Sequence, residues 1–575
     1  MRLQPLKDGP RRADTTKRLL STAMVDDALI VGLVTLLFLP TLMHGAPDGH
    51  SHHFNHAWAT TFSEAWSWSN PYPRWLPGMW QGAGSPDFYF YPPFGFFIVA
   101  LASKTCCVAA EHSLAVAYWG LHVLSGIGVY RLAQSLGFTR IGCLAVAVAL
   151  ILMPYHLAVV FHRSAIGEMA AFAALGFLLS AITDLLLRGE GAWRIVLTAP
   201  ICILGHILVA PIIGLAVLCL VVAYRRDLRL DRVLRAAVMG FAGVLIAGAY
   251  WVPALLLREA DATAYLLLYY WGGQLLTWDA IAVDPFLYIV YIPLFVVTPL
   301  ALLGAALMWR RSSRTAALSA AIIVACWFMV SPLSVIIWFH TPLSIMQFPW
   351  RFLLLFDFGA ALGLGLLVER AISQEVTPAR ALARFGTGGF LGGIAIILVV
   401  GHTHWLPTGP IEARLQWKIE ERIGPLEWLS LGGRERSFDL DDLTRRRSVM
   451  PPLLNAPEVQ TLTAGATADL IASDPFQILF EASSSTGMEI VLRRSFWPYW
   501  RLEPLDGGPA VPLSATEGHP LVTATLPAGR QQWRLSLATP PSLWLGILVS
   551  CLGLALAIGG LVALQRKPRA QQRSA

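Results

Sequence analysis

A histidine-rich stretch, APDGHSHHFNHAW at residues 46–58, concentrates side chains that can do chemistry. Four of the fourteen histidines of the chain fall there: His50, His52, His53 and His56. Asp48 stands just before them and could act as a general base or as a metal ligand. Imidazole suits zinc or copper, and the four-residue spacing of His52 and His56 can chelate a metal on a helix. A polar hydrogen-bonding loop without a metal is the alternative.

The segment PYHLAVVFHRSAIGEMA, residues 154–170, contains a second polar group between two apolar runs. Arg163 and Glu168, with His162 beside them, would lie at the mouth of two membrane helices. Charged residues at a membrane boundary can be simple anchors, whereas a pair that faces a cavity is a functional-site hypothesis. The arginine fork suits phosphate, and the acid could take a proton or hold a metal.

Three more ionisable residues lie in or beside apolar segments: His206 in LGHILVA, Arg351 in MQFPWRF, and Asp357 just after it. A lone histidine among apolar residues is more often structural, but Asp357 would be costly if it faced lipid. A lipid-linked phosphate substrate would use the whole set. Such a substrate needs a cation for the phosphate, an acid or base near the carbon under attack, and a groove between helices for the isoprenoid tail.

The segment PRWLPGMWQGAGSPDFYFYPPFGFF, residues 73–97, is dense in Trp, Tyr, Pro and Gly. Trp and Tyr favour the membrane interface because one end of the side chain is apolar and the other is polar. Aromatic rings also stack on sugar faces, so Trp75 and Tyr91 are candidate substrate-binding residues. An aromatic belt at the membrane surface is the alternative for each of them.

The composition places these residues in a membrane protein. Of the 575 residues, 55% are hydrophobic and 14% are charged, whereas about 25% are charged in a soluble domain. The mean hydropathy is +0.58. We therefore expect a polytopic α-helical membrane protein. The net charge of +7 comes from short arginine clusters between apolar runs, and it does not indicate a nucleic-acid partner.

About twelve segments are candidate membrane spans: 24–44, 113–133, 141–161, 165–187, 195–206, 208–223, 236–257, 286–308, 315–335, 349–368, 386–403 and 543–565. With these spans all the basic clusters face the cytoplasm, as the positive-inside rule requires. Both termini would then be cytoplasmic, in the inner (cytoplasmic) membrane of a cell. The pair 195–223 is short enough to be re-entrant, with His206 at its apex, and 91–110 would be a membrane-embedded or interfacial helix pair.

The spans predict five parts: a cytoplasmic basic N-terminus (1–23), a transmembrane domain (24–404) with a long first outer loop (45–90), an extracytoplasmic domain (405–541), a last helix (542–565) and a cytoplasmic basic tail (566–575). Segments such as FQILFEA and QQWRLSL in the extracytoplasmic domain alternate apolar and polar residues, which predicts half-buried strands. We expect a β-sandwich there. None of the seven cysteines lies in this region, so its own hydrophobic core must hold it.

Four stretches of the chain, in order, resemble bacterial and archaeal membrane proteins labelled 6-pyruvoyl-tetrahydropterin-synthase-related and their multi-span relatives. The stretches are 73–97, 154–172, MQFPWRFLLL at 346–355 and RSFWPYWRLEPLDGG at 494–508. The second stretch keeps Arg163 and Glu168 at the family's separation. Pterin synthases themselves are small soluble zinc enzymes, which this chain does not resemble. The architecture instead resembles the GT-C glycosyltransferases, multi-span enzymes with a long first outer loop that use polyprenyl-phosphate sugars.

The GT-C resemblance implies that Asp48 is the acidic residue of the first outer loop and Glu168 a second-loop acid. The chain departs from the usual GHD pattern, because Gly49-His50-Ser51 stands there and the aspartate is displaced to Asp48. In this interpretation Asp48 deprotonates the acceptor, and Glu168 or a divalent metal (Mg²⁺ or Mn²⁺) assists. Arg163 and Arg351 hold the lipid-linked phosphate.

The sequence thus predicts a membrane glycosyltransferase that takes a polyprenyl-phosphate-linked sugar on the extracytoplasmic face. It would transfer the sugar with inversion to a glycan, lipid or protein acceptor. One alternative is a transporter of a lipid-linked saccharide, which would need polar groups through the membrane. The other is a non-catalytic assembly protein of the cell envelope that docks through its β-domain.

Overall fold

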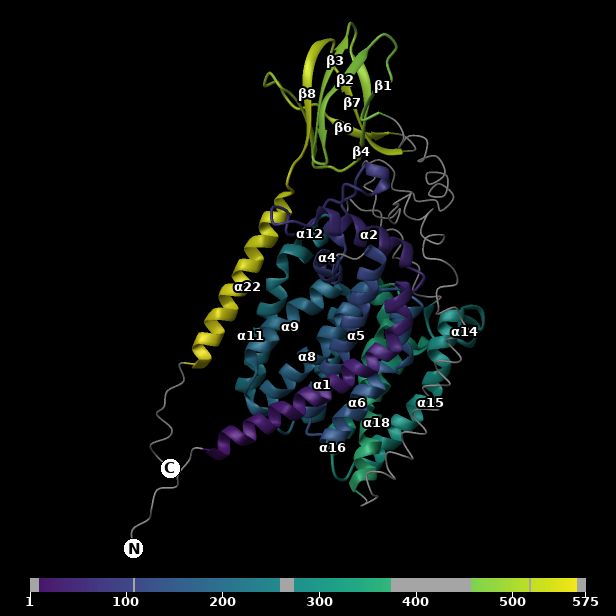
Figure 1. Cartoon of the computed structure of the whole chain (residues 1–575), viewed down its shortest axis with the longest axis vertical. Coiled ribbons are helices and arrows are strands. Elements are labelled where there is room, and N and C mark those ends of the chain that lie inside the picture. Colours follow the sequence, from purple (N-terminus) through teal and green to yellow (C-terminus); the bar gives the residue numbers. More distant parts are fainter. Residues whose placement is uncertain (1–9, 107–108, 259–273, 374–456, 517–518, 566–575) are drawn as a thin grey trace, which may run out of the picture.

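The computed structural model describes residues 10–106, 109–258, 274–373, 457–516 and 519–565. Helices form a bundle, and a β-domain lies at one end of it (Figure 1). The last helix, α22 (Pro541–Gln565), runs from the β-domain along the outside of the bundle. The first residues of α1 (Pro10–His44) and the last residues of α22 both lie on the side of the bundle away from the β-domain.

The longer helices between α1 and α22 are α2 (His52–Ala65), α4 (Phe94–Cys106), α5 (Ala110–Ser135), α6 (Arg140–Ile151), α7 (Pro154–Phe161), α8 (Ile166–Arg188), α9 (Ala192–Gly205), α10 (Ala210–Tyr224), α11 (Leu230–Ile246), α12 (Gly248–Leu256), α15 (Pro285–Met308), α16 (Ser313–Val330) and α18 (Leu353–Ser373). Short helical turns connect some of them: η1 (Trp80–Gly82), α3 (Asp87–Phe90), η2 (Ile207–Val209), α14 (Trp278–Val283), η5 (Pro332–Ser334), α17 (Val335–His340), η6 (Pro342–Met346) and η7 (Pro349–Phe352).

Eight of the described helices are long and apolar enough to cross a membrane, or up to ten spans if each of two bent pairs counts as one. The bent pairs are α6–α7, with an angle of 45°, and α11–α12, with an angle of 66°. The expected spans 141–161 and 236–257 are therefore broken helices. The expected count of about twelve is not confirmed, since α9, which covers most of the expected span 195–206, is a shorter apolar helix. The expected span at 386–403 lies outside the described residues.

The α8 helix lies inside the bundle, since nearly all of its side chains are buried. Gly176 of α8 packs on α5, where an added Cβ would lie 2.6 Å from the carbonyl carbon of Gly128. Small residues allow membrane helices to pack this closely. Gly167, in the first turn of α8, makes a similar contact, with an added Cβ 2.9 Å from the carbonyl oxygen of Gly205. This contact brings the start of α8 next to His206, which joins α9 to the turn before α10.

Ser550 of α22 forms hydrogen bonds with backbone groups at the break between α11 and α12. Its hydroxyl accepts a hydrogen bond from the backbone N–H of Ala249 at 2.8 Å and donates one to the carbonyl oxygen of Ile246 at 2.8 Å. Backbone groups freed by a broken helix must find partners inside a membrane. The last helix, which carries the β-domain, is therefore attached to the bundle by polar as well as apolar contacts.

The β-domain is a sandwich of two four-stranded antiparallel sheets. One sheet has the order β1-β4-β7-β6, and the other has the order β2-β3-β8-β5. The strands are β1 (Val459–Thr461), β2 (Thr467–Asp474), β3 (Gln477–Ser484), β4 (Met488–Ser495), β5 (Trp500–Pro504), β6 (Leu513–Thr516), β7 (His519–Leu526) and β8 (Gly529–Leu537). Buried and more exposed residues alternate along β3, where the sequence predicted a half-buried strand, and the same alternation occurs along β5. The core between the sheets includes Phe480, Leu492 and Trp533.

The first outer loop packs directly against the sandwich. Trp75 lies edge-on to Trp500, with the ring centroids 5.3 Å apart, and both belong to the core of the sandwich. The backbone N–H of Ser495 donates to the carbonyl oxygen of Ala83 at 2.8 Å. The segment around residues 75–90 therefore connects the β-domain to the helical bundle.

Candidate functional site

Backbone hydrogen bonds join the first outer loop (45–90) to the loop between α7 and α8 (162–165), which is named the second outer loop after the side of the membrane expected for it. The N–H groups of His50 and Ser51 donate to the carbonyl oxygens of His162 and Arg163, at 2.9 Å and 3.0 Å. The N–H of Gly49 donates to the hydroxyl of Ser164 at 3.0 Å. Two loops more than a hundred residues apart thus form one unit.

This docking requires glycine at position 49. An added Cβ there would lie 2.5 Å from Ser164 Oγ and 2.7 Å from the carbonyl oxygen of His162, closer than real Cβ atoms come. The hydroxyl of Ser164 also donates to the carbonyl oxygen of Pro47 at 2.7 Å. These bonds on both sides of Asp48 place this exposed residue beside the loop that carries Arg163.

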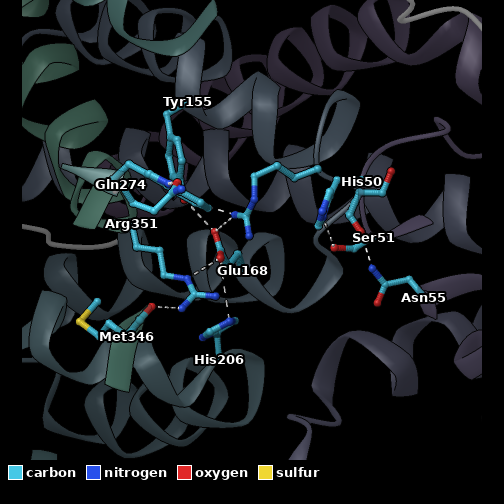
Figure 2. Close-up of polar contacts among 12 residues, drawn as sticks. His50, Ser51, Asn55, Tyr155, Glu168, His206, Gln274, Met346 and Arg351 are labelled. Carbon is cyan, nitrogen blue, oxygen red and sulfur yellow. Dashed lines mark hydrogen bonds and ion pairs between the residues drawn. The ribbon is translucent and has the colours of Figure 1, made fainter. Parts of the chain in front are cut away.

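A buried carboxylate, Glu168, is the centre of the polar cluster in Figure 2. Its Oε2 accepts from Arg163 Nη1 at 2.5 Å and from the hydroxyl of Tyr155 at 2.8 Å. Its Oε1 accepts from Arg351 Nε at 2.9 Å. Arg351 also donates to the carbonyl oxygen of Met346. The four side chains come from α7, the second outer loop, α8 and η7, and the Met346 carbonyl comes from η6, so the cluster joins five elements.

The cluster carries more positive than negative charge in a buried place. Glu168 is 2% exposed and Arg351 is 8% exposed. Arg163 is close to buried as well, with a side chain 12% exposed. Two guanidinium groups share one carboxylate, which leaves one positive charge. Burying an uncompensated charge is costly, so this arrangement favours an anionic ligand.

His206 and Tyr91 complete the cluster as neutral groups. His206 Nε2 lies 4.0 Å from Glu168 Oε1, and burial together with the charge of Arg351 lowers the pKa of His206 to about 3. Burial and the negative charge of Glu168 raise the pKa of Tyr91 to about 12. An added Cβ on Gly167 would meet both side chains, at 3.4 Å from the Tyr91 hydroxyl and 3.6 Å from the His206 ring. Neither residue therefore adds charge near neutral pH.

Aromatic side chains hold the arginine from the other side. The guanidinium of Arg163 lies over the ring of Trp350, 4.3 Å from its centroid. Trp350 Nε1 donates to the side-chain oxygen of Gln274, four residues before α14, at 3.1 Å. His162 stacks on Phe286 with ring centroids 5.3 Å apart, and burial lowers the pKa of His162. Arg163 is thus held in a defined position, as a cation that recognises one group must be.

His52 and His56 form no part of the cluster around Glu168 and lie beside another buried acid, Glu111. Their Nε2 atoms are 3.5 Å and 3.6 Å from Glu111 Oε2, in the first turn of α5. Within the described residues, no group of three or more His, Cys, Asp or Glu side chains is arranged to hold a metal ion. A metal also fits poorly at Glu168, because two guanidinium groups occupy both carboxylate oxygens. Metal binding by His52 and His56 stays a prediction.

The structure brings together five of the residues that the sequence singled out: Arg163, Glu168, His206, Arg351 and Tyr91. His162 precedes Arg163 in the same loop, and Asp48 lies on the segment whose backbone binds this loop. Trp75 does not lie there, because it is 2% exposed in the core of the β-sandwich. Its buried ring holds the first outer loop on the sandwich and has no face for a sugar.

Sequence reasoning missed Tyr155, Trp350, Gln274 and Glu111. Tyr155 and Trp350 stand inside the segments PYH and FPWRF, close to candidate residues. Tyr155 and Trp350 could have been found from the sequence, because each has an aromatic ring within a few positions of a charged or polar candidate residue. Gln274 and Glu111 carry no signal of this kind, since their partners are distant in the chain.

A family model described as "6-pyruvoyl-tetrahydropterin synthase related domain; membrane protein" matches residues 88–399, more than half of the chain. The chain belongs to this family. The matched region includes Arg163, Glu168, His206 and Arg351, and it ends before the β-sandwich begins. No curated protein matches the chain.

Solved structures of two kinds of glycosyltransferase are similar to the chain. One is the arabinofuranosyltransferase AftD from Mycobacteria, with 15% identity and a TM-score of 0.47 over 67% of this chain. The other is the oligosaccharyltransferase of Archaeoglobus fulgidus in the apo form, with 13% identity and a TM-score of 0.40 over 75% of this chain. The chain spans 27% of the first protein and 59% of the second. Likenesses of this size do not fix an activity, which has to be argued from the site.

Proposed function

We propose that the protein is a membrane glycosyltransferase that binds a polyprenyl-phosphate-linked sugar at the Arg163–Glu168–Arg351 cluster. The observation that carries this proposal is the buried excess of one positive charge, two guanidinium groups on a single carboxylate. The phosphodiester of such a donor carries one negative charge and accepts hydrogen bonds from arginine forks. The surrounding apolar helices would receive the isoprenoid tail.

Glu168 is the positioning carboxylate of this site. Its oxygens already accept three hydrogen bonds, from Arg163, Tyr155 and Arg351. A base must have a lone pair directed at the proton it removes. Glu168 therefore orients the two arginines, a role different from those expected from the sequence, which were taking a proton, holding a metal or assisting Asp48.

Asp48 is the acceptor-side base in this proposal. It is exposed on the loop segment that docks on residues 162–164. Its carboxylate would take the proton of the acceptor hydroxyl, whose oxygen attacks the anomeric carbon. The bond between that carbon and the phosphate oxygen breaks, and the polyprenyl phosphate leaves with its charge held by Arg163 and Arg351. One displacement of this kind inverts the anomeric centre.

A transfer assay on the full chain tests the proposal. Purified protein in lipid nanodiscs is given a panel of polyprenyl-phosphate sugars with glycan, lipid and protein acceptors, and the release of polyprenyl phosphate is followed. Asp48→Asn should lower turnover at least about a hundredfold while donor binding is kept. Asp469→Asn, on an exposed position of β2, is the matched control and should not change turnover.

The rival functions give different results in the same assay. A saccharide transporter would move the intact donor across a vesicle membrane and release no polyprenyl phosphate. An envelope assembly protein would bind no donor, and its cellular role would survive Asp48→Asn and Arg163→Ala. Either result would overturn the transferase proposal.

A further inference from the structure

A second buried polar layer lies beside the arginine cluster: His122 and Ser125 of α5, His156 of α7 and Asp357 of α18. All four side chains are fully buried, at 0% exposure. The rings of His122 and His156 stack with centroids 4.1 Å apart and an angle of 8°. Ionisable residues within membrane segments are expensive and mark functional places. This layer takes no part in the reaction described above.

The layer surrounds the break between α6 and α7. The carbonyl oxygens of Leu150 and Ile151, at the end of α6, face His156 Nδ1 at 2.9 Å and His122 Nε2 at 3.1 Å. A carbonyl oxygen only accepts, so each of these ring nitrogens carries the proton. His122 therefore gives a partner to the Ile151 carbonyl oxygen at the bend, and His156 adds a second bond to the Leu150 carbonyl oxygen, which also accepts from the N–H of Met153 at 3.1 Å.

Asp357 accepts a hydrogen bond from a backbone N–H at the start of α7, on the other side of the break. Its Oδ2 accepts from the backbone N–H of His156 at 2.9 Å, in the first turn of α7. The residue at the helix N-cap, Met153, has no side chain that could accept this bond. The side chain of Asp357 in α18, 201 positions away, thus accepts a hydrogen bond that an N-cap side chain usually accepts.

The α7 helix connects this layer with the arginine cluster. It has only eight residues, so its position depends on how its two ends are held. Tyr155, next to His156, donates to Glu168. Arg163 follows two residues after the end of α7 and donates to the same oxygen. A shift at the start of α7 would therefore move both donors.

We propose that Asp357 is a positioning residue for the arginine cluster, acting through its bond to the first turn of α7. It touches neither substrate nor reacting atoms. By fixing the start of α7 it sets where Tyr155 and Arg163 meet Glu168. The part of this inference that concerns ligand binding rests on the proposed function, whereas the hold on α7 does not.

Asp357→Leu and Asp357→Asn form the test pair. The two side chains are similar in size, but only asparagine keeps an oxygen that accepts from the His156 N–H. The full chain in nanodiscs is measured by amide hydrogen exchange over residues 154–163 and by binding of polyprenyl monophosphate. Asp357→Leu should speed exchange in this segment and weaken binding about tenfold. Asp357→Asn should behave as the unchanged protein.

Ser319→Ala is the matched control, because the Ser319 hydroxyl of α16 donates to α18 itself, at the carbonyl oxygen of Gly359. It should leave both readouts unchanged. Normal exchange and binding in Asp357→Leu would overturn the inference, and so would equal damage in Asp357→Asn. If Asp357→Leu and Asp357→Ala do not fold while Asp357→Asn does, Asp357 is a folding residue and the positioning role is wrong. If the unchanged protein binds no polyprenyl phosphate, the proposed function fails, while the exchange data still decide the inference.

Discussion

Arg351 donates its Nε proton to Glu168 Oε1 at 2.9 Å, although 183 positions separate the two residues. The bond joins the turn before α18 to the first turn of α8, and Arg163 reaches the second oxygen of the same carboxylate. A single acid thus fixes two cations from different parts of the chain. The proposed phosphate site depends on that shared carboxylate.

Glu168→Gln should destabilise the fold strongly. The change leaves two buried guanidinium groups without a counter-charge, and breaking a buried pair in this way costs about 3–5 kcal/mol. Thermal unfolding in detergent is the measurement. Glu489→Gln, at an exposed position of β4, should leave the melting temperature unchanged. Equal melting temperatures for Glu168→Gln and the unchanged protein would mean that water reaches the two guanidinium groups in the folded protein.

Replacing either arginine by lysine should weaken the binding of polyprenyl phosphate by about tenfold or more. Lysine keeps the charge but has no planar fork, and it cannot both hold Glu168 and present donors to a phosphate. Binding of a fluorescent polyprenyl phosphate to Arg163→Lys and Arg351→Lys measures this effect. Arg530→Lys, on the exposed face of β8, is the control. Unchanged affinity in both site variants would place the phosphate elsewhere.

Gly49→Ala should separate the first outer loop from the second. The new methyl group would collide with Ser164 Oγ and the His162 carbonyl oxygen, and an overpacked contact of this kind costs about 1–3 kcal/mol. We expect a large loss of transfer activity with a modest loss of thermal stability. Gly32→Ala is the control, because nothing lies within 4 Å of a Cβ added there. Full activity in Gly49→Ala would show that the docking of the two loops is not needed.

Acid should destabilise the protein in part through His206. Burial holds the pKa of this residue at about 3 in the folded protein, whereas an unfolded histidine has a pKa of about 6.5. The unfolded state therefore binds a proton that the folded state does not, and stability falls as the pH falls from about 6.5 toward about 3. His206→Gln should lose less melting temperature between about pH 7.5 and about pH 5 than the unchanged protein. Identical losses would mean that His206 titrates normally.

Local sequence patterns predicted what depends on local chemistry. Apolar runs indicated the membrane class, alternation indicated the β-sandwich, and Arg163 and Glu168 stand close enough in one loop to be paired from the sequence alone. The breaks at 152–153 and 247 could not be predicted, because they are stabilised by partners far away in the chain, such as Asp357 and Ser550. Mean hydropathy is averaged over the length of a span, so it does not detect a break of one or two residues and predicts an unbroken helix.

The roles of single side chains were harder to predict for the same reason. Trp75 is a residue type that can stack on a sugar, but its ring packs against strands that follow about four hundred residues later in the chain. Glu168 was expected to take a proton or to hold a metal, yet Arg351 comes from a distant helical turn and donates a hydrogen bond to one of its oxygens. In both cases the residue type was informative, and the role depended on tertiary contacts.

The buried arginine pair is proposed to hold a lipid-linked phosphate beside Asp48. A structure of the full chain in nanodiscs with a non-cleavable polyprenyl phosphonate sugar tests this central claim most directly. We predict phosphonate oxygens within about 3 Å of guanidinium nitrogens of both Arg163 and Arg351, with the anomeric carbon turned toward the loop that carries Asp48. A phosphonate bound away from these arginines, or a sugar turned away from residues 47–51, would contradict it.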